Sequence, residues 1–280
     1  MKRSLLRYFG GKRLLSSKIE KLLPSDIVHF RSVFLGGGGL EFNLSPIGVS
    51  EVWNDLDGQL INFYSVIKNP ELFSKFQFLC ELTPFSEEEF SKASFMANLE
   101  GVDNFGENVL LAYCFFVSNR MSRGGDGKSF ATSTSRLRRG MNEQVSAWLG
   151  VVDNLVDFHD RLKYVEIRKM EFTDFINKYD NQDAFFYLDP PYLPSTRKAG
   201  GYDFEMSEPD HVALLDTLSS IRGRFILHGY PSDLYEDFSR SNNLDSFEIS
   251  VKKHSSSGKV KPDAIEKLWS NYDLKKEVSR

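Results

Sequence analysis

The stretch Ala184-Phe185-Phe186-Tyr187-Leu188-Asp189-Pro190-Pro191-Tyr192 decides the fold. Its apolar and aromatic start is typical of a short strand that is buried on both faces of a parallel sheet. Because proline has no N–H to donate to a sheet ladder, the two prolines end the strand. The pattern therefore predicts Asp189 at the carboxyl end of a strand, where open α/β sheets bind their ligands.

The end of this stretch combines three groups that could bind a planar heterocycle. The Asp189 carboxylate and the Pro190 carbonyl are acceptors for an amino group, and the Tyr192 ring offers a stacking surface. The competing interpretation is a strand followed by a Pro-Pro turn with a solvated aspartate. The stretch alone does not decide between the two, so the rest of the chain must.

Composition bounds the class of protein. The 280 residues, 41% hydrophobic and 26% charged, predict a soluble globular protein with one large domain or two modest ones. No apolar run approaches the roughly 20 residues of a membrane span, and the first residues lack the apolar core of a signal peptide. We therefore expect a cytoplasmic protein. Cys80 and Cys114 lie in apolar surroundings and the histidines are scattered, so we expect neither a disulfide nor a metal site.

Charge is distributed unevenly along the chain. The net charge of −4 argues against a nucleic-acid binder, yet the stretch from Ser118 to Asn142 holds six cations and one acid, Asp126. The cations are Arg120, Arg123, Lys128, Arg136, Arg138 and Arg139. Glycine, serine and threonine separate them, which predicts a basic loop that binds phosphates; an ordinary solvated loop is the alternative.

Two glycine segments precede this region. Gly10, Gly11 and Lys12 stand just before a helix predicted over residues 14–23, which indicates close backbone approach to a ligand with Lys12 near an anion. The spacing is not that of a phosphate-binding P-loop. Further on, the predicted strand Val33–Leu35 runs into Gly36–Gly39, the strand–glycine loop opening of a Rossmann-like unit.

A second strand is predicted at Val49–Trp53, followed by Asn54 and Asp55. An acid in this position of a Rossmann fold bonds ribose hydroxyls. The competing role for Asp55 is the N-cap of the helix that the periodicity predicts over residues 56–67.

The remaining pattern predicts an α/β fold with a mainly helical insertion. Helical stretches are expected at 86–97, 108–117, 143–162, 172–179 and 208–221, strands at 164–167 and 224–230, and a terminal antiparallel hairpin at 246–251 and 264–269. We predict a catalytic domain in two parts, residues 1–68 and 171–280, interrupted by an insertion at 69–170.

In this order the segments resemble the Dam-like DNA adenine methyltransferases. That family has a Tyr/Trp-x-Gly-x-Lys segment, a glycine loop, an acidic strand end, a target-recognition region and Asp-Pro-Pro-Tyr. The matching segments here are Tyr8–Lys12, Phe34–Gly39, Asn54-Asp55, residues 70–170 and Asp189–Tyr192. The chain departs from the family at Ser32-Val33, where members often have Glu-Pro, and at His228, where many have serine.

The resemblance implies a Rossmann-like S-adenosylmethionine-dependent methyltransferase sheet and a site-specific enzyme that methylates the exocyclic amine of a flipped-out adenine. It implies Asp189, Pro190 and Tyr192 as catalytic residues. The implied cofactor contacts are Tyr8, Gly10, Lys12, Phe34, Gly36, Gly37, Gly38, Asn54, Asp55 and Asp189. Arg197 joins the six cations of the basic loop as a DNA contact. Double-stranded DNA is the implied partner, and neither a metal nor a membrane is expected. The implied protein is a monomer or weak dimer with a role in restriction–modification.

Three alternatives stay open at this point. Relatives that methylate the cytosine amine usually have serine in place of Asp189, an enzyme acting on RNA would carry the same motifs, and a catalytically silent relative would bind DNA or cofactor only. The intact Asp-Pro-Pro-Tyr favours the adenine methyltransferase.

Overall fold

The computed structural model describes residues 4–8, 12, 15–99, 108–196, 204–251 and 264–274. Gly10 and Arg197, two of the predicted ligand contacts, lie outside these residues. The chain divides into two compact units. The first comprises Met1–Ser17, Gly36–Pro46 and Asp55–Lys169, and the second comprises Lys18–Leu35, Ile47–Asn54 and Met170–Arg280.

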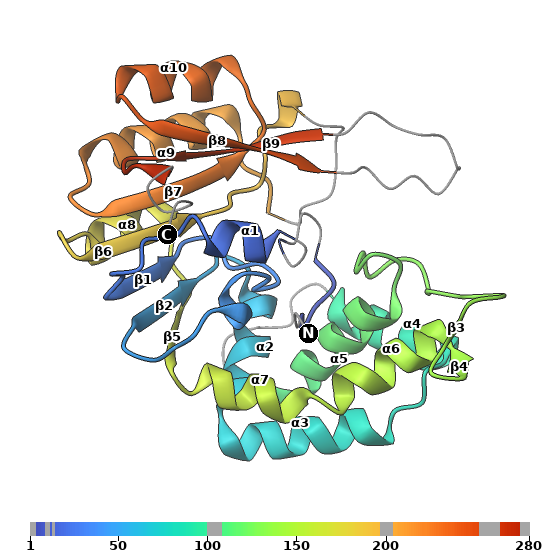
Figure 1. Cartoon of the computed structure of the whole chain (residues 1–280). Coiled ribbons are helices and arrows are strands. Elements are labelled where there is room, and N and C mark those ends of the chain that lie inside the picture. The colour runs from blue at the N-terminus through green and yellow to red at the C-terminus, as the bar shows by residue number, and fades with distance from the viewer. Residues whose placement is uncertain are drawn as a thin grey trace. The chain divides into compact units, whose positions relative to one another are not determined.

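The second unit is built on a mixed sheet (Figure 1). Its elements are β1 (His29–Ser32), β2 (Ser50–Asn54), α8 (Phe172–Tyr179), β6 (Ala184–Leu188), η3 (Pro194–Thr196), α9 (Glu208–Ser220), β7 (Arg224–Gly229), α10 (Asp233–Ser241), β8 (Asp245–Val251) and β9 (Ala264–Ser270). Its strands follow the order β2-β1-β6-β7-β9-β8, parallel from β2 to β7 and antiparallel in β9 and β8. The predicted α/β fold with a terminal antiparallel hairpin is confirmed.

The central strand β6 is buried along its whole length. On one face Phe186 and Leu188 join side chains of α8, α9 and α10 in a single apolar core. On the other face Phe185 and Tyr187 stack on Phe30 of β1. A strand covered on both faces needs an unbroken apolar sequence, which explains why this run is the clearest strand signal in the chain.

The first unit is mainly helical. Its elements are η2 (Glu41–Asn43), α2 (Gly58–Lys68), α3 (Pro70–Leu82), α4 (Glu87–Ala97), α5 (Val109–Met121), β3 (Leu137–Arg138), β4 (Met141–Asn142), α6 (Glu143–Val152), α7 (Leu155–Leu162) and β5 (Val165–Arg168). Helix α1 (Ser16–Glu20) lies where the chain passes from the first unit to the second. Aromatic rings form the core of the first unit. The centroid of the Phe63 ring of α2 lies 5.8 Å from that of Phe76 of α3 and 5.6 Å from that of Phe116 of α5.

Several element boundaries differ from the sequence prediction. Strand β1 ends at Ser32, before the predicted Val33–Leu35. The apolar pattern does not reveal this strand because the buried Arg31 interrupts it, and the Arg31 guanidinium donates to the Phe30 and Ser50 carbonyls. The helix predicted over 143–162 is two helices, α6 and α7, and the one predicted over 14–23 is the five-residue α1.

Helix α3 was not predicted, although the sequence carries its signals. The Asn69 side chain accepts from the N–H groups of Glu71 and Leu72, and Pro70 occupies the first turn. Phe73, Phe76 and Cys80 then recur at helical spacing and are buried. An Asn-Pro start followed by this periodicity is a helix signal.

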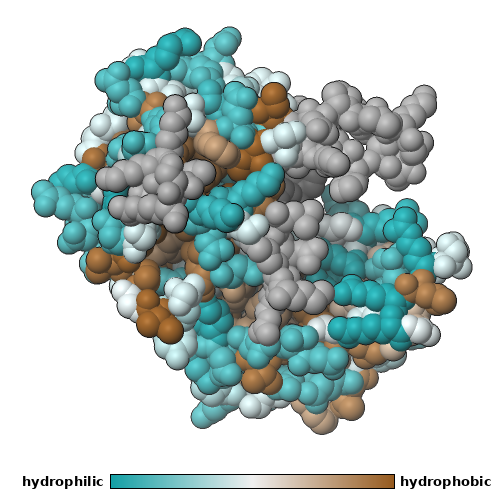
Figure 2. Space-filling view, in the orientation of Figure 1, coloured by the Kyte–Doolittle hydropathy of each residue, from teal (hydrophilic) through white to brown (hydrophobic). Residues whose placement is uncertain are grey.

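Figure 2 shows one face, on which hydrophilic residues predominate and hydrophobic residues form separate spots. Among the described residues no helix is long and apolar enough to cross a bilayer. Cys80 and Cys114 are free and buried, and burial raises the pKa of the Cys114 thiol to about 11.

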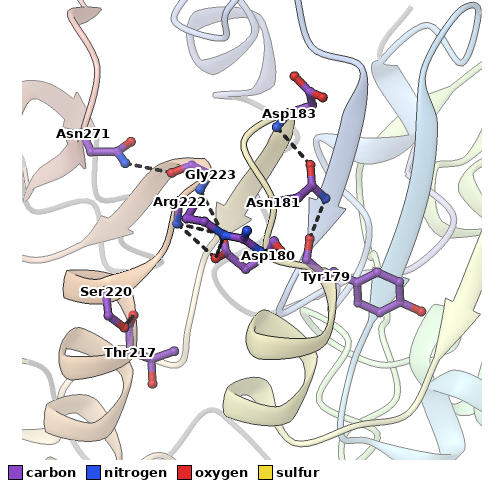
Figure 3. Close-up of polar contacts among 9 residues, drawn as sticks. All are labelled: Tyr179, Asp180, Asn181, Asp183, Thr217, Ser220, Arg222, Gly223 and Asn271. Carbon is purple, nitrogen blue, oxygen red and sulfur yellow. Dashed lines mark hydrogen bonds and ion pairs between the residues drawn. The ribbon is translucent and has the colours of Figure 1, made fainter.

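A polar network joins the turns that precede β6 and β7 (Figure 3). The Asp180 carboxylate accepts from the backbone N–H groups of Arg222, at 2.9 and 3.0 Å, and Gly223, at 2.9 Å. The Arg222 guanidinium donates to the Asp180 carbonyl, and Asn271 donates to the Gly223 carbonyl, at 2.8 and 2.9 Å. A Cβ on Gly223 would lie 2.8 Å from the Ala184 carbonyl oxygen, so this turn accommodates only glycine.

We expect Asp180→Ala to lower the free energy of unfolding by about 3 kcal/mol, because it leaves two backbone N–H groups without their charged acceptor. The matched control is Asp183→Ala, which removes an exposed carboxylate from the same turn and should cost about 0.5 kcal/mol or less. Urea unfolding followed by circular dichroism measures both. Equal midpoints for the two variants would show that the network does not stabilise the fold.

Candidate active site

Three parallel strands of the second unit end at one edge of its sheet. Ser32 of β1 pairs with Trp53 of β2 and with Tyr187 of β6, and the Val33 N–H continues the ladder to the Tyr187 carbonyl at 3.0 Å. The Leu35 N–H donates to the Asn54 carbonyl at 2.9 Å. The residues that follow β1, β2 and β6 therefore leave the sheet at the same edge, which is where open α/β sheets bind ligands.

Asn54 fixes the separation of the chain segments at this edge. Its buried side-chain amide donates to the carbonyls of Val33 and Met170, at 3.1 and 3.0 Å, and its carbonyl oxygen accepts from the Met170 N–H at 2.9 Å. With these backbone contacts the side chain positions the edge, and its predicted contact with a cofactor stays a prediction. Phe34 lies in the same loop, with its ring 5.8 Å from the Phe172 ring.

Asp189 and Tyr192 lie together beyond the end of β6. The Asp189 side chain is 18% exposed, and its Oδ1 lies 4.0 Å from Nδ1 of His228 on β7. Pro190 and Tyr192 are buried. The Tyr192 ring contacts the Tyr230 ring edge to face at 4.7 Å between centroids.

Glu266 of β9 is a member of this cluster that the sequence analysis missed. Its Oε2 lies 2.8 Å from Nε2 of His228 and accepts the Tyr192 hydroxyl at 3.2 Å. Burial, with the nearby Glu266 carboxylate, raises the pKa of Tyr230, which keeps that phenol neutral. The one signal in the sequence is an acid two residues before the apolar pair Leu268-Trp269 of the terminal strand; its partner Tyr192 is 74 residues away along the chain.

The glycine loop in the first unit is held by Asp55. One Asp55 oxygen accepts from the Gly36 N–H at 2.8 Å, and the other accepts from the Asp57 N–H at 3.0 Å. The Tyr64 hydroxyl donates to the Gly36 carbonyl at 3.0 Å, and burial raises the pKa of Tyr64, so it stays a neutral donor. Asp55 thus holds the glycine loop in place. The sequence predicts that Asp55 and this loop contact the same ligand.

Aromatic rings explain why the loop is glycine. A Cβ on Gly37 would lie 2.7 Å from Cβ of Tyr8, and one on Gly36 would lie 2.9 Å from the Tyr8 ring. Gly38, with φ of +61°, would place a Cβ 2.7 Å from the Phe42 ring. The structure therefore brings together Tyr8, Gly36, Gly37, Gly38 and Asp55, and their contact with a cofactor stays a prediction. Lys12, in the same unit, is buried.

The N-cap role suggested for Asp55 belongs instead to Asp57. Helix α2 begins at Gly58, and the Asp57 carboxylate accepts from the N–H groups of Gln59 and Leu60 at 2.8 and 3.2 Å. The helix starts two residues later than predicted. Asp55 is consequently available for the loop.

The basic stretch contains more structure than a loop. Strands β3 and β4 form a two-stranded hairpin whose turn, Arg139-Gly140, has φ of +54° and +74°. This backbone is that of a two-residue turn with both central residues left-handed. The predicted cations Arg123, Lys128, Arg136, Arg138 and Arg139 are exposed. Arg120 differs, because its guanidinium donates to the Ala147 carbonyl at 3.2 Å and its Nε is buried.

No group of three or more histidine, cysteine, aspartate or glutamate side chains within the described ranges could hold a metal ion. The described site residues form two groups. The glycine loop of the first unit, with Asp55 and Tyr8, offers backbone and aromatic surface. The Asp189 cluster of the second unit offers a partly exposed carboxylate with aromatic rings beside it.

Comparison with known proteins gives a consistent result. The model of the D12 class N6 adenine-specific DNA methyltransferases matches residues 8–257. The chain is 27% identical over 278 residues to the Type II methyltransferase M1.LlaDCHI of Lactococcus lactis subsp. cremoris, covering 92% of this chain and 93% of that protein. It is 25% identical to the modification methylase StsI of Streptococcus sanguinis, spanning 98% of this chain but 43% of that longer protein.

Among solved structures, the chain resembles the precorrin-6Y C5,15-methyltransferase of Geobacter metallireducens GS-15 at 10% identity, with coverage of 93% and 86% of the two chains. The TM-score is 0.37, which is too low to support an argument.

We expect Gly38→Ala to lower the free energy of unfolding by about 3 kcal/mol, because a left-handed backbone and a clash with Phe42 add. Gly48→Ala is the matched control: φ is +76° there, but no atom lies within 4 Å of the added Cβ. It should cost about 1 kcal/mol, the backbone part alone. Urea unfolding measures the loss in free energy of unfolding for both variants. Equal losses would mean that the Phe42 ring moves aside without an energetic penalty.

Proposed function

We propose, for a chain that belongs to the D12 class N6 adenine-specific DNA methyltransferases, that S-adenosylmethionine is the methyl donor and that Asp189, Pro190 and Tyr192 hold the acceptor adenine. Enzymes of this family methylate the N6 amine of adenine in DNA, and this chain is one of them. The observation that carries the residue assignment is the position of Asp189, a partly exposed carboxylate directly after a fully buried strand.

The chemistry needs orientation more than a strong base. The donor is a sulfonium whose methyl group is already activated, so the protein supplies binding and alignment. The adenine amine is a weak nucleophile because its lone pair is delocalised into the ring. Hydrogen bonds from this amine to the Asp189 carboxylate and the Pro190 carbonyl favour a pyramidal nitrogen with its lone pair toward the methyl. Asp189 would accept the proton that the amine releases when S-adenosylmethionine supplies the methyl group.

The first unit supplies the remaining contacts of the proposed cofactor site. Tyr8 and the backbone of Gly36, Gly37 and Gly38 form its surface, and Asp55 bonds the ribose hydroxyls. The support is local: one Asp55 oxygen accepts from the Gly36 N–H, so the carboxylate lies beside the loop, and a carboxylate oxygen accepts more than one hydrogen bond. Lys12, Phe34 and Asn54 border this site by sequence and stay predictions.

The acceptor base must leave the duplex. A paired adenine is unreachable inside the stack, so the target is flipped out at a cost of a few kcal/mol. We propose that residues 69–170 recognise the DNA, with the exposed cations around β3 and β4 on the phosphates. The names of the relatives support a role as the modification enzyme of a restriction–modification system.

The proposal predicts that Asp189→Ala abolishes most turnover while the protein still binds S-adenosylmethionine and duplex DNA. Single-turnover transfer of a labelled methyl should slow by on the order of a hundredfold, as for loss of a group that acts in the transition state. Asp183→Ala, at the opposite end of β6, is the control and should keep the wild-type rate. If Asp189→Ala transferred methyl groups as fast as its control, the assignment of Asp189 would be wrong.

A second prediction concerns the exposed cations. Replacing Arg136, Arg138 and Arg139 by alanine should flatten the plot of log affinity for duplex DNA against log salt by about one unit per lost phosphate contact. The control replaces Lys92, Lys163 and Arg240, exposed cations that are each paired with a neighbouring carboxylate on their own segment. Filter binding over a salt series measures the slopes. An unchanged slope in the first variant would exclude this hairpin from phosphate binding.

A further inference from the structure

We propose that Glu266 is a positioning residue for the methyl transfer, acting on Asp189 and Tyr192 from the terminal hairpin. This inference rests on the proposed function of the Asp-Pro-Pro-Tyr segment. One carboxylate oxygen of Glu266 serves both links: it accepts the Tyr192 hydroxyl at 3.2 Å and lies 2.8 Å from Nε2 of His228.

The register of the sheet brings the residues together. His228 of β7 pairs with Leu268 of β9, so Glu266, two residues along β9, is its diagonal neighbour. Diagonal neighbours of an antiparallel pair are within reach when the side chains are long. The other imidazole nitrogen of His228 faces Asp189 at 4.0 Å. The hairpin strand is thereby connected to both functional side chains of the loop after β6.

Stability gives no sufficient reason for an acid in this place. Glu266 is 7% exposed and His228 is fully buried. Taking a carboxylate out of water is costly, and well-packed apolar residues in its place are often at least as stable. Among the described residues of the same hairpin, the other buried side chains are Ile249, Leu268, Trp269 and Ser270, and none of them is ionisable. A buried carboxylate that bonds the site's own tyrosine fits a role in the reaction.

The two links have separate effects. The bond to the Tyr192 hydroxyl fixes the direction of the ring that meets the adenine. The contact with His228 limits the positions open to the imidazole, whose other ring nitrogen lies 4.0 Å from the Asp189 carboxylate that orients the amine. Removing Glu266 therefore loosens the alignment of a bound adenine, while the glycine loop and the exposed cations stay as they are. We expect the loss in the rate of transfer and not in binding.

The experiment is a double-variant cycle on Glu266 and Tyr192, read by single-turnover methyl transfer to duplex DNA. Glu266→Ala should slow transfer by about 30-fold and Glu266→Gln, which keeps one acceptor oxygen, by about fivefold. Tyr192→Phe, which keeps the ring and removes the hydroxyl, should slow it by about fivefold. Tyr192→Phe combined with either Glu266 variant should be no slower than the slower single variant, because both changes remove one interaction.

The matched control is Glu236→Ala. Glu236 of α10 forms an ion pair with Lys267, the next residue of β9, at 2.8 Å, and it takes no part in the site. It should transfer methyl groups at the wild-type rate. Affinities for S-adenosylmethionine and DNA are titrated for every variant, and they should match the wild type within about twofold.

Two outcomes would overturn the inference: Glu266→Ala as fast as Glu236→Ala, or double variants slowed by the product of the single effects. If Glu266→Ala fails to fold, the Glu266→Gln cycle is judged by the same criterion. Asp189→Ala, run alongside, separates the two claims. A wild-type rate for Asp189→Ala refutes the proposed function, whereas a slow Asp189→Ala with a fast Glu266→Ala refutes only the positioning role.

Discussion

The parallel pairing of β6 with β1 is the constraint on which the rest of the second unit depends. It brings Tyr187 beside Ser32, so the chain leaves both strands at one edge, and Asn54 holds that edge through Val33 and Met170. Residues 33–35 follow β1, and Asp189 follows β6 directly. The sheet thus determines the edge at which these residues leave it.

The sequence predicted the central strand and Asp189 well, because a strand buried on both faces leaves an uninterrupted apolar run that two prolines end. It misplaced β1, whose buried Arg31 is satisfied by backbone carbonyls that only the folded sheet supplies. It also offered Asp55 as a competing candidate for the helix cap that Asp57 provides, since two acids so close together give the same local signal.

Long-range partners were beyond the sequence altogether. Nothing local to Glu266 says that its carboxylate meets Tyr192 and His228, because that meeting follows from the register of β7 and β9. In the sequence, His228 stands out only because many members of the family have serine at this position. The sequence indicates the glycine loop at the correct positions, but it gives only close approach of a ligand as the reason for glycine. The structure adds a second reason, because Tyr8 and Phe42 occupy the space that side chains in the loop would need.

The β3–β4 hairpin has an evolutionary consequence. Its side chains Leu137, Arg138 and Arg139 are exposed, and its turn depends on the backbone of Arg139-Gly140. Substitutions at the exposed Leu137, Arg138 and Met141 leave the core of the first unit untouched, so selection for folding hardly limits them, whereas Asn142 caps α6. Strand β6, by contrast, is buried along its whole length. A lineage with this design can diversify the exposed residues of the hairpin while the buried strand is inherited unchanged.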